Sequence, residues 1–126
     1  MIIDEIVAAF ADCEGWWNPD PTVIPRAANN PMDLVFAFQN GATPKQFGTN
    51  MRKFATWPHP QGGIVAAYRQ VYAWTSLGLS LSSMIAEQDP GNLDYQSRMK
   101  ALLPHVDFYV PVLSLIPDLI RPAWNA

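Results

Sequence analysis

IDEIVAAFADCEG, residues 3–15, repeats apolar residues at intervals of three and four positions, which is the spacing of an amphipathic helix. At about 100° per residue these apolar side chains gather on one side, and Trp17 would continue the same stripe. Asp4 and Glu5 suit the positive end of a helix dipole, and Gly15 is a typical residue after a last helical turn. We therefore expect a helix from Ile3 to Glu14 whose buried stripe consists of Ile3, Ile6, Val7 and Phe10.

Glu14 lies inside this apolar stripe, unlike the other acidic residues of the predicted helix. It follows Phe10 by four positions and Val7 by seven. Partial burial disfavours the charged form of a carboxyl group and raises its pKa, which is what a general acid working near neutral pH needs. The structural alternative is that Glu14, as the last helical residue, turns to solvent or bonds a loop amide. Glu14 is the residue that we expect to carry any chemistry.

Three more helices are predicted in the second half of the chain. The first spans Gly63 to Leu77, with its apolar stripe formed by Ile64, Ala67, Tyr68, Val71 and Thr75. Ser80 or Ser82 can cap a short second helix that ends near residues 89–91, and Asn92 can cap a third that reaches Leu103. A proline-punctuated tail, residues 105–126, is expected to form short helical turns. The expected core includes Phe10, Ile64, Val71 and Ile85.

Proline and glycine divide the chain between the first and second predicted helices. Pro19, Pro21 and Pro25 are expected to prevent a regular element before a tight turn at residues 26–31. Residues 34–57 then combine strand-like residue types with glycine-containing loops, which predicts a small hairpin or an irregular β lobe. Residues 1–126 are thus expected to form a single, mostly α domain with a β-like lobe at 34–57.

Composition excludes several classes of protein. With 126 residues, 49% hydrophobic and only 15% charged, the chain is neither a disordered acidic tail nor a solvated coiled coil. A net charge of −3 argues against nucleic acid as the main ligand. The longest apolar stretch near the end, residues 110–120, is interrupted by Pro111, Pro117 and Asp118, so no membrane span is expected.

Cysteine and histidine offer little support for other chemistry. A single cysteine, Cys13, cannot form an internal disulfide. A cysteine hydrolase would have to pair it with His59 or His105, but nothing in the sequence positions such a pair, and Cys13 is better interpreted as a small hydrophobe. The two histidines belong to no cluster with metal-ligand spacing. No metal and no cofactor is therefore expected.

Aromatic and amide side chains favour a carbohydrate ligand. Aromatic faces pack against sugar rings, while Asn and Gln side chains bond hydroxyl and acetamido groups. Many aromatics must belong to the core, but Trp16 lies off the buried stripe. We expect Glu14, Asn30, Gln39 and at least one of Trp16 or Trp57 to border one concave surface.

The order of four short motifs resembles that of small bacterial and phage-associated lysozyme-like domains, which are related to soluble lytic transglycosylases and goose-type lysozymes. In that group a helix ends in Glu-Gly, an Asn-Asn-Pro-Gly turn follows, and a small β lobe leads to an aromatic- and proline-rich segment that opens a helix. The resemblance runs from the first helix to near Tyr95. The sequence departs from the family pattern at Met32, which stands where glycine is usual. The matching segments are Glu14-Gly15-Trp16, Asn29-Asn30-Pro31, Gly41-Ala42-Thr43 and Phe54-Ala55-Thr56-Trp57-Pro58, followed by Gly63-Ile64.

The resemblance implies a lysozyme-like helical lobe with a glycan cleft closed on one side by the β lobe. It implies Glu14 as the catalytic acid, Asn30 and Gln39 as cleft-wall residues, and the peptidoglycan backbone as substrate. One glutamate can suffice in such enzymes, because the N-acetyl group of the substrate can assist at the anomeric carbon, an exception to the two-carboxylate rule. The acidic N-terminus does not resemble a secretory signal, so we expect a cytoplasmic or phage-encoded protein that is released by another route.

A non-enzymatic module on the same fold is the main alternative, since a fold alone does not decide function. Such a module would bind glycan or serve assembly without catalysis. The two readings differ in whether Glu14 lines an open groove or is sealed by Trp16, Trp17 and the β lobe.

Overall fold

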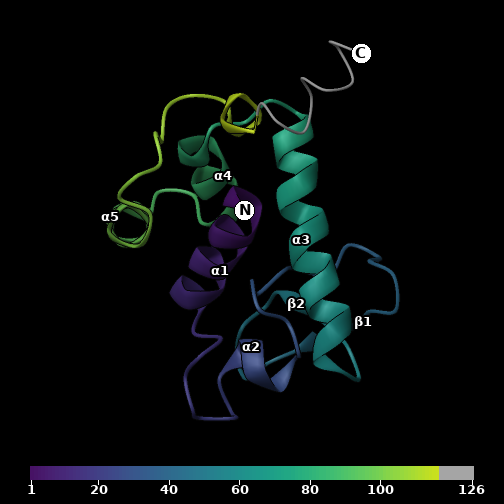
Figure 1. The fold of residues 1–126 in the computed structure, drawn as a ribbon. Helices are drawn as coiled ribbons and strands as arrows, with labels where there is room; N and C mark the ends of the chain where they lie inside the picture. Colours follow the sequence, from purple (N-terminus) through teal and green to yellow (C-terminus); the bar gives the residue numbers. More distant parts are fainter. Residues whose placement is uncertain (117–126) are drawn as a thin grey trace.

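The computed structural model describes residues 1–116 and has five α-helices, one short 3-10 helix and a two-stranded antiparallel hairpin (Figure 1). The mostly α class predicted from the sequence is confirmed, while residues 117–126 of the expected tail lie outside the described part. No helix in residues 1–116 is long and apolar enough to cross a membrane. The elements are α1 (Ile2–Glu14), α2 (Ile24–Ala27), β1 (Thr43–Gln46), β2 (Lys53–Thr56), α3 (Pro60–Ser76), α4 (Leu81–Gln88), α5 (Leu93–Leu102) and η1 (Val112–Leu115).

Helix α1 ends where the sequence predicts, because Gly15 adopts a left-handed conformation with φ of 95°. The Gly15 N–H donates to the Asp12 carbonyl at 3.1 Å, and the Trp16 N–H donates to the Ala11 carbonyl at 3.0 Å. This turn takes the chain away from the helix axis, so the helical period does not extend beyond it. Trp17 was expected in the buried stripe but is 57% exposed, and that expectation is wrong.

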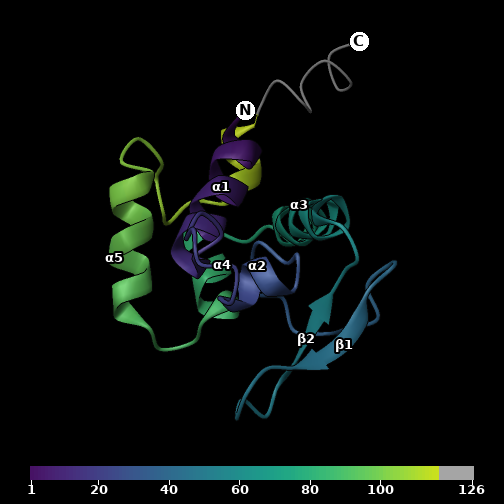
Figure 2. The ribbon, with the colours of Figure 1, turned by 90° about the horizontal axis from the view of Figure 1, so that it is seen from below.

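The core lies between α1 and the helices that pack on it, α3 and α5 (Figure 2). Phe10 of α1 is fully buried, and its ring centroid lies 5.8 Å from that of Trp74 and 6.1 Å from that of Tyr95. Val71 and Ile85 are buried as predicted. Ile64 is 38% exposed, so its assignment to the core is wrong: the buried face of α3 is centred on Ala67, Val71 and Trp74, and Ile64 lies at its margin.

Two predicted caps begin the helices that complete this core. The Ser80 hydroxyl accepts a hydrogen bond from the Ser83 N–H at 3.2 Å, and the Asn92 side chain accepts one from the Tyr95 N–H at 3.1 Å. Each satisfies one of the free N–H groups that every helix leaves at its first turn.

Helix α2 is a single turn that the sequence did not predict. Pro25 was expected to prevent regular structure, but it lies in the first turn of α2, where a proline has no intrahelical hydrogen bond to lose. Asn29 then follows the helix with φ of 52°. Asparagine tolerates this left-handed conformation better than most residues.

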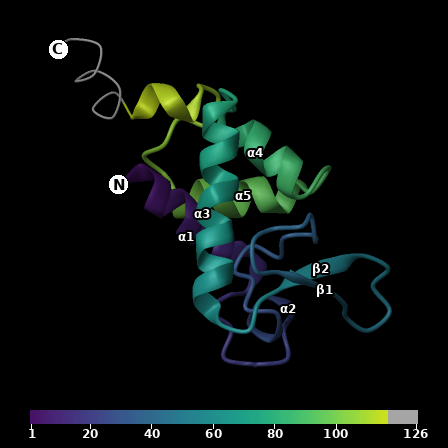
Figure 3. The same ribbon diagram turned by 90° about the vertical axis from the view of Figure 1, so that its right-hand side faces the viewer.

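The β lobe, residues 34–57, contains a hairpin in which Thr43 pairs with Thr56 and Gln46 with Lys53. Its strands are shorter than the strand-like composition indicates, and the segment around Val35 contributes only an isolated bridge to Phe54. Phe38 leaves the extended conformation altogether, with φ of 59°. The hairpin extends away from the helices (Figure 3).

Asn30 joins the β lobe to the rest of the domain through a fully buried side chain. Its amide nitrogen donates to the carbonyls of Leu34 and Ala55, each at 2.9 Å, and its oxygen accepts from the Leu34 N–H at 2.9 Å. The neighbouring Asn29 donates to the Trp57 carbonyl at 2.8 Å. The two asparagines therefore bind the Ala55 carbonyl within β2 and the Trp57 carbonyl directly after it.

Two glycines allow the start of α3 to approach the 29–31 turn and Trp57 closely. A Cβ atom on Gly63 would lie 1.7 Å from the Asn29 carbonyl oxygen, and one on Gly62 would lie 2.5 Å from the Trp57 ring. Neither position accepts a side chain without a shift of backbone or of a buried indole. Glycine is thus needed at residue 63 for the contact between α3 and the 29–31 turn, and at residue 62 for the contact with Trp57.

We predict that Asn30→Asp lowers the free energy of unfolding by about 2–4 kcal/mol, measured by urea unfolding at neutral pH. The substitution removes both N–H donors and places a buried carboxylate beside two carbonyls. The Ala55 carbonyl loses its donor, and the Leu34 carbonyl keeps only the Ala55 N–H at 3.0 Å. Asn50→Asp is the matched control, because its exposed side chain only accepts from the Arg52 N–H (3.0 Å), which aspartate can also do. Equal unfolding midpoints for the two variants would contradict the structural role of Asn30.

Candidate functional site

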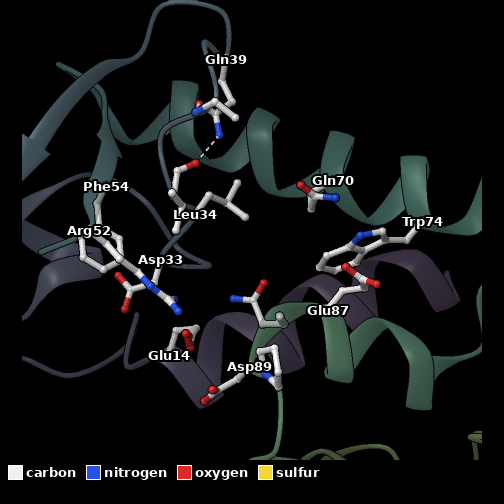
Figure 4. Close-up of a pocket in the computed structure, with 14 residues that line it drawn as sticks. Glu14, Asp33, Leu34, Gln39, Arg52, Phe54, Gln70, Trp74, Glu87 and Asp89 are labelled. Atoms are coloured by element: carbon white, nitrogen blue, oxygen red, sulfur yellow. Dashed lines mark hydrogen bonds between the residues drawn. The ribbon is translucent and has the colours of Figure 1, made fainter.

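A cleft of about 550 Å³ separates the helices from the β lobe (Figure 4). Glu14 at the end of α1 forms one part of it, and Gln70 and Trp74 of α3 form another. The end of α4 contributes Glu87 and the following Asp89. The β lobe contributes Leu34, Val35, Ala37, Gln39, Arg52 and Phe54, and the wall is completed by Asp33, Gln88 and Pro90.

Glu14 is half-buried in this cleft, and its pKa is raised to about 7. Desolvation by burial is the main cause, followed by the negative charge of Asp33. Gln88 and Tyr95 act in the opposite direction because nearby hydrogen-bond donors favour the charged form, although the Gln88 nitrogen itself donates to the Met32 carbonyl. The Tyr95 hydroxyl has no partner in regular hydrogen-bonding geometry, so its stabilisation of the carboxylate is weak. Glu14 therefore retains its proton up to near neutral pH, the direction that its place in the helix predicts.

Asp33 is a second carboxyl group in the cleft with a perturbed proton affinity. Burial raises its pKa to about 7, and its Oδ1 atom is buried without a hydrogen-bond partner. The backbone of Asp33 has φ of 53°, a conformation that aspartate tolerates and most side chains do not. The cleft thus holds two carboxyl groups of raised pKa.

The charge balance of the cleft is acidic. Four carboxyl groups line it, and Arg52 is the one cation among the lining residues. Within residues 1–116 no carboxylate lies within ion-pair distance of Arg52, since the ion pairs there are Met1 with Asp4 and Glu5 with His105. In Figure 4 the Arg52 side chain points toward the end of the cleft where Asp33 and Glu14 lie. The guanidinium is therefore available to a ligand.

The cleft continues along α3 into a second hollow of about 450 Å³. Leu34, Gln39 and Gln70 line both, so the two form one elongated depression. Apolar atoms from Val65, Ala66 and Ala73 alternate in the second hollow with the polar groups of Gln61 and Arg69. An elongated surface of this kind suits a chain-like ligand with both apolar and hydroxyl-bearing faces.

The structure brings together only part of the site expected from the sequence. Glu14 and Gln39 share the cleft, and Glu14 lines it openly rather than being sealed by Trp16 and Trp17. Gln39 uses its amide within its own loop: its oxygen accepts from the Ala37 N–H at 2.8 Å and its nitrogen donates to the Val35 carbonyl at 2.9 Å.

The other three predicted site residues do not line this cleft. Asn30 is fully buried, and both its amide nitrogen and its amide oxygen are hydrogen-bonded. It contributes to the site only by holding Leu34 in place. Trp57 is 3% exposed, and its indole N–H donates to the Asn40 carbonyl at 2.9 Å. Trp16 lines a separate hollow of about 180 Å³ between α1 and α3. The expected concave surface, bordered by Glu14, Asn30, Gln39 and at least one of the two tryptophans, is therefore not formed: only Glu14 and Gln39 line this cleft.

Cys13 and the histidines do not assemble a nucleophilic site in residues 1–116. Cys13 is buried, and desolvation raises the pKa of its thiol, which disfavours the reactive thiolate. His105 contacts Glu5 at 3.0 Å, and His59 precedes α3 on the surface. The same part of the chain holds no group of three or more His, Cys, Asp or Glu side chains arranged for a metal ion.

The sequence reasoning missed Asp33, Arg52 and Gln88. Asp33 carried a usable signal, because it is an acidic residue inside the otherwise apolar run from Met32 to Phe36. Arg52 and Gln88 carried none, since each lies in a polar segment where any neighbour could have been chosen. Their place in the site follows from how the β lobe and α4 are packed.

Comparison with protein-family models finds no match, and comparisons with curated proteins and with solved structures find no significant similarity. Any chemistry of the cleft therefore has to follow from its own residues.

We predict that the protein becomes less stable as pH rises from about 4 to 8. The folded-state pKa values of Glu14 and Asp33, about 7, exceed the ordinary values of 4.5 and 3.8, so the folded state binds protons more tightly than the unfolded state. The stabilisation is fully present below the unfolded pKa values and is lost as pH passes 7. At about 1.4 kcal/mol per pKa unit, the loss is on the order of 3–4 kcal/mol per carboxyl group.

Thermal unfolding at a series of pH values measures this effect. The double variant Glu14→Gln/Asp33→Asn should show a much flatter profile between pH 5 and 8, and a higher melting temperature than wild type at pH 8. Asparagine suits the positive φ of residue 33. A wild-type protein whose melting temperature rises steadily over this range would refute the raised pKa values.

Proposed function

We propose that this protein cleaves the glycan strand of peptidoglycan, by hydrolysis or by lytic transglycosylation, with Glu14 as the general acid. One observation supports the proposal above the others: a half-buried carboxyl group with a pKa of about 7 lies in an open, elongated cleft. A general acid has to be protonated at the working pH and accessible to the leaving-group oxygen. Glu14 meets both conditions.

The lining of the cleft suits an amino-sugar polymer. The amide of Gln70, and that of Gln88, whose nitrogen also donates to the Met32 carbonyl, offer donors and acceptors for hydroxyl and acetamido groups. Leu34, Phe54 and Trp74 are largely buried, and the edges that they expose to the cleft offer small apolar contacts for sugar rings. Arg52 adds a cation without a carboxylate partner in the described chain, which suits an acidic substituent on the glycan.

Asp33 gives the site the second acidic group found in most glycosidases. Two carboxyl groups that share a desolvated site resist ionising together, so one stays protonated while the other carries the charge. Glu14 is the donor in this proposal, and an ionised Asp33 stabilises the positive charge that develops at the anomeric carbon. The negative charge of Asp33 also keeps the proton on Glu14.

The order of motifs supports the same reading. The segments that resemble lysozyme-like domains, Glu14-Gly15, the 29–31 turn, the β lobe and the start of α3, are adjacent in this fold and surround the cleft or hold its walls. We accordingly propose that the fold is lysozyme-like, with a helical lobe and a β lobe on either side of a glycan cleft.

We predict that Glu14→Gln lowers the rate of peptidoglycan cleavage by at least about 100-fold, the usual scale of a lost general acid. Glutamine keeps the shape and the hydrogen-bonding capacity but has no proton to transfer. Purified peptidoglycan is incubated with each protein, and released muropeptides are quantified by mass spectrometry, which also distinguishes hydrated from anhydro products. Melting temperature at pH 8 should hold or rise, because an amide is less costly to desolvate than a carboxylate.

Asp12→Asn is the control, because Asp12 is an exposed acid on the same helix and lies outside the cleft. Its activity should equal that of wild type. Full activity in Glu14→Gln would eliminate the mechanism. A wild type that binds peptidoglycan and leaves every peptidoglycan and chitin substrate intact would favour the non-catalytic glycan-binding module.

We further predict that Asp33→Asn moves the alkaline limb of the pH–activity profile to lower pH. Activity should fall above pH 7 in the wild type as Glu14 loses its proton. Removing the negative charge of Asp33 lowers the pKa of Glu14, so the fall begins earlier. Profiles of kcat/KM against pH report this group in the free enzyme. An unshifted alkaline limb would show that Asp33 does not act on Glu14.

A further inference from the structure

The acidic residues of this chain avoid one long segment. Residues 34–86 contain no Asp or Glu, so all 11 acidic residues lie before or after it. The second hollow is lined by residues between 34 and 73, all of which belong to this acid-free segment. The charge of the elongated depression therefore changes along its length. Among the described residues, four carboxyl groups line the first hollow, whereas Arg69 is the one charged residue that lines the second.

The helical repeat of α3 places Arg69 in the second hollow. Gln61, Val65 and Arg69 are four positions apart, so they lie one above the other on the same face of the helix. The segment before β1 supplies the other wall with Leu34 and Asn40. A cation is thus held on a regular helix, beside apolar atoms and amide groups.

The Arg69 side chain is available to an anion. It is exposed, and no carboxylate of residues 1–116 lies within ion-pair distance of it. Arg52, the cation of the first hollow, lies instead among four carboxyl groups that offset its charge. A guanidinium presents a fork of N–H donors that matches the two oxygens of a carboxylate. An anionic group of a ligand is therefore favoured at Arg69 rather than at Arg52.

We propose that the second hollow binds a carboxylate substituent of the glycan, and that Arg69 is the residue that distinguishes peptidoglycan from chitin. This inference rests on the proposed function, because it takes the polymer held beside Glu14 to continue into the second hollow. Muramic acid bears a lactyl group that ends either in a carboxylate or in a peptide with carboxylates of its own, whereas chitin has no carboxylate. Val65, Ala66 and Ala73 offer apolar contacts beside this charge.

The change of charge along the depression favours a glycan over a uniform polyanion. A polyphosphate or a nucleic acid that filled both hollows would place negative charge beside the four carboxyl groups of the first, where repulsion disfavours it. A peptidoglycan strand carries its carboxylates on every second sugar. A neutral sugar can therefore lie among the carboxyl groups while the substituent of its neighbour lies at Arg69.

Binding to the Glu14→Gln variant tests the inference without turnover. Titration calorimetry compares chitotetraose with a peptide-free tetrasaccharide of alternating N-acetylglucosamine and N-acetylmuramic acid, and with the same tetrasaccharide bearing peptide stems. In this background Arg69→Gln should weaken binding of a carboxylate-bearing ligand about three- to fivefold, the usual scale of an exposed charge pair, and should leave chitotetraose binding unchanged. A loss with the peptide-free ligand identifies the lactyl carboxylate, and a loss confined to the stem-bearing ligand identifies the peptide.

Two further variants serve as controls in the same background. Arg69→Lys keeps the charge but not the fork of donors, so it should retain part of the preference for carboxylate-bearing ligands. Arg98→Gln removes an exposed arginine of α5 that lines neither hollow, and it should bind all three ligands as Glu14→Gln alone does. Glutamine is a good helix former, so Arg69→Gln should keep the melting temperature of its parent.

The possible outcomes separate this inference from the proposed cleavage. Arg69→Gln that weakens chitotetraose binding equally, or that leaves all three affinities unchanged, would overturn the role of Arg69 while the cleavage proposal stands. A wild type that cleaves nothing, combined with a preference that depends on Arg69, would refute cleavage and leave the inference intact. A Glu14→Gln protein that binds none of the three ligands would overturn the glycan ligand and this inference together.

Discussion

The buried amide of Asn30 is the interaction on which the arrangement of this domain depends. One side chain supplies hydrogen bonds to Leu34 on both its N–H and its carbonyl, and a third to Ala55 of β2. The segment that carries Asp33 and the strand that carries Phe54 are thereby held in a set position relative to each other. Because Asn30 is completely enclosed, loss of any of these bonds would leave a polar group buried without a partner. Asp33, Leu34 and Phe54 all line the cleft, so the bonds of Asn30 fix this wall of the site.

The cleft holds two carboxyl groups at positions where burial disfavours the charged form. Burial raises the pKa of both Glu14 and Asp33 to about 7, and neither has an ion-pair partner in the described chain. An interior selected only for stability would use apolar side chains here. The combination of two uncompensated acids and an open cleft is instead typical of sites where protons are transferred, and it is the reason the proposed chemistry centres on Glu14.

Local features of the sequence predicted the helical part of the fold well. The apolar period of residues 3–14, the glycine after it and the caps at Ser80 and Asn92 act over four residues or fewer, so they can be read without knowing the rest of the chain. The same reasoning failed where a turn redirected the chain. Trp17 left the stripe beyond the left-handed Gly15, and Ile64 lay at the edge of a face whose centre depends on which helices pack against α3.

The site shows where sequence reasoning reaches its limit. The raised pKa of Glu14 could be predicted because its cause, a position on the buried side of a helix, is local. Asn30 was expected to border the cleft but is fully buried, because a sequence does not show whether an amide faces solvent or the backbone of a distant strand. At least one of Trp16 and Trp57 was expected at the cleft from the order of motifs and from the position of Trp16 off the buried stripe, but the structure places Trp16 in another hollow and Trp57 in the core.

By itself, the sequence determined the four longer α-helices, the end of α1, the caps of α4 and α5 and the acidic residue on the buried side of α1, because these depend on spacing and on the backbone preferences of single residues. Only the tertiary structure decided that Asp33 stands beside Glu14, that Arg52 reaches the same cleft and that Asn30 lies inside. Those relations arise from packing between segments far apart along the chain. Desolvation and electrostatic interaction depend on distance in space, which a linear sequence does not contain.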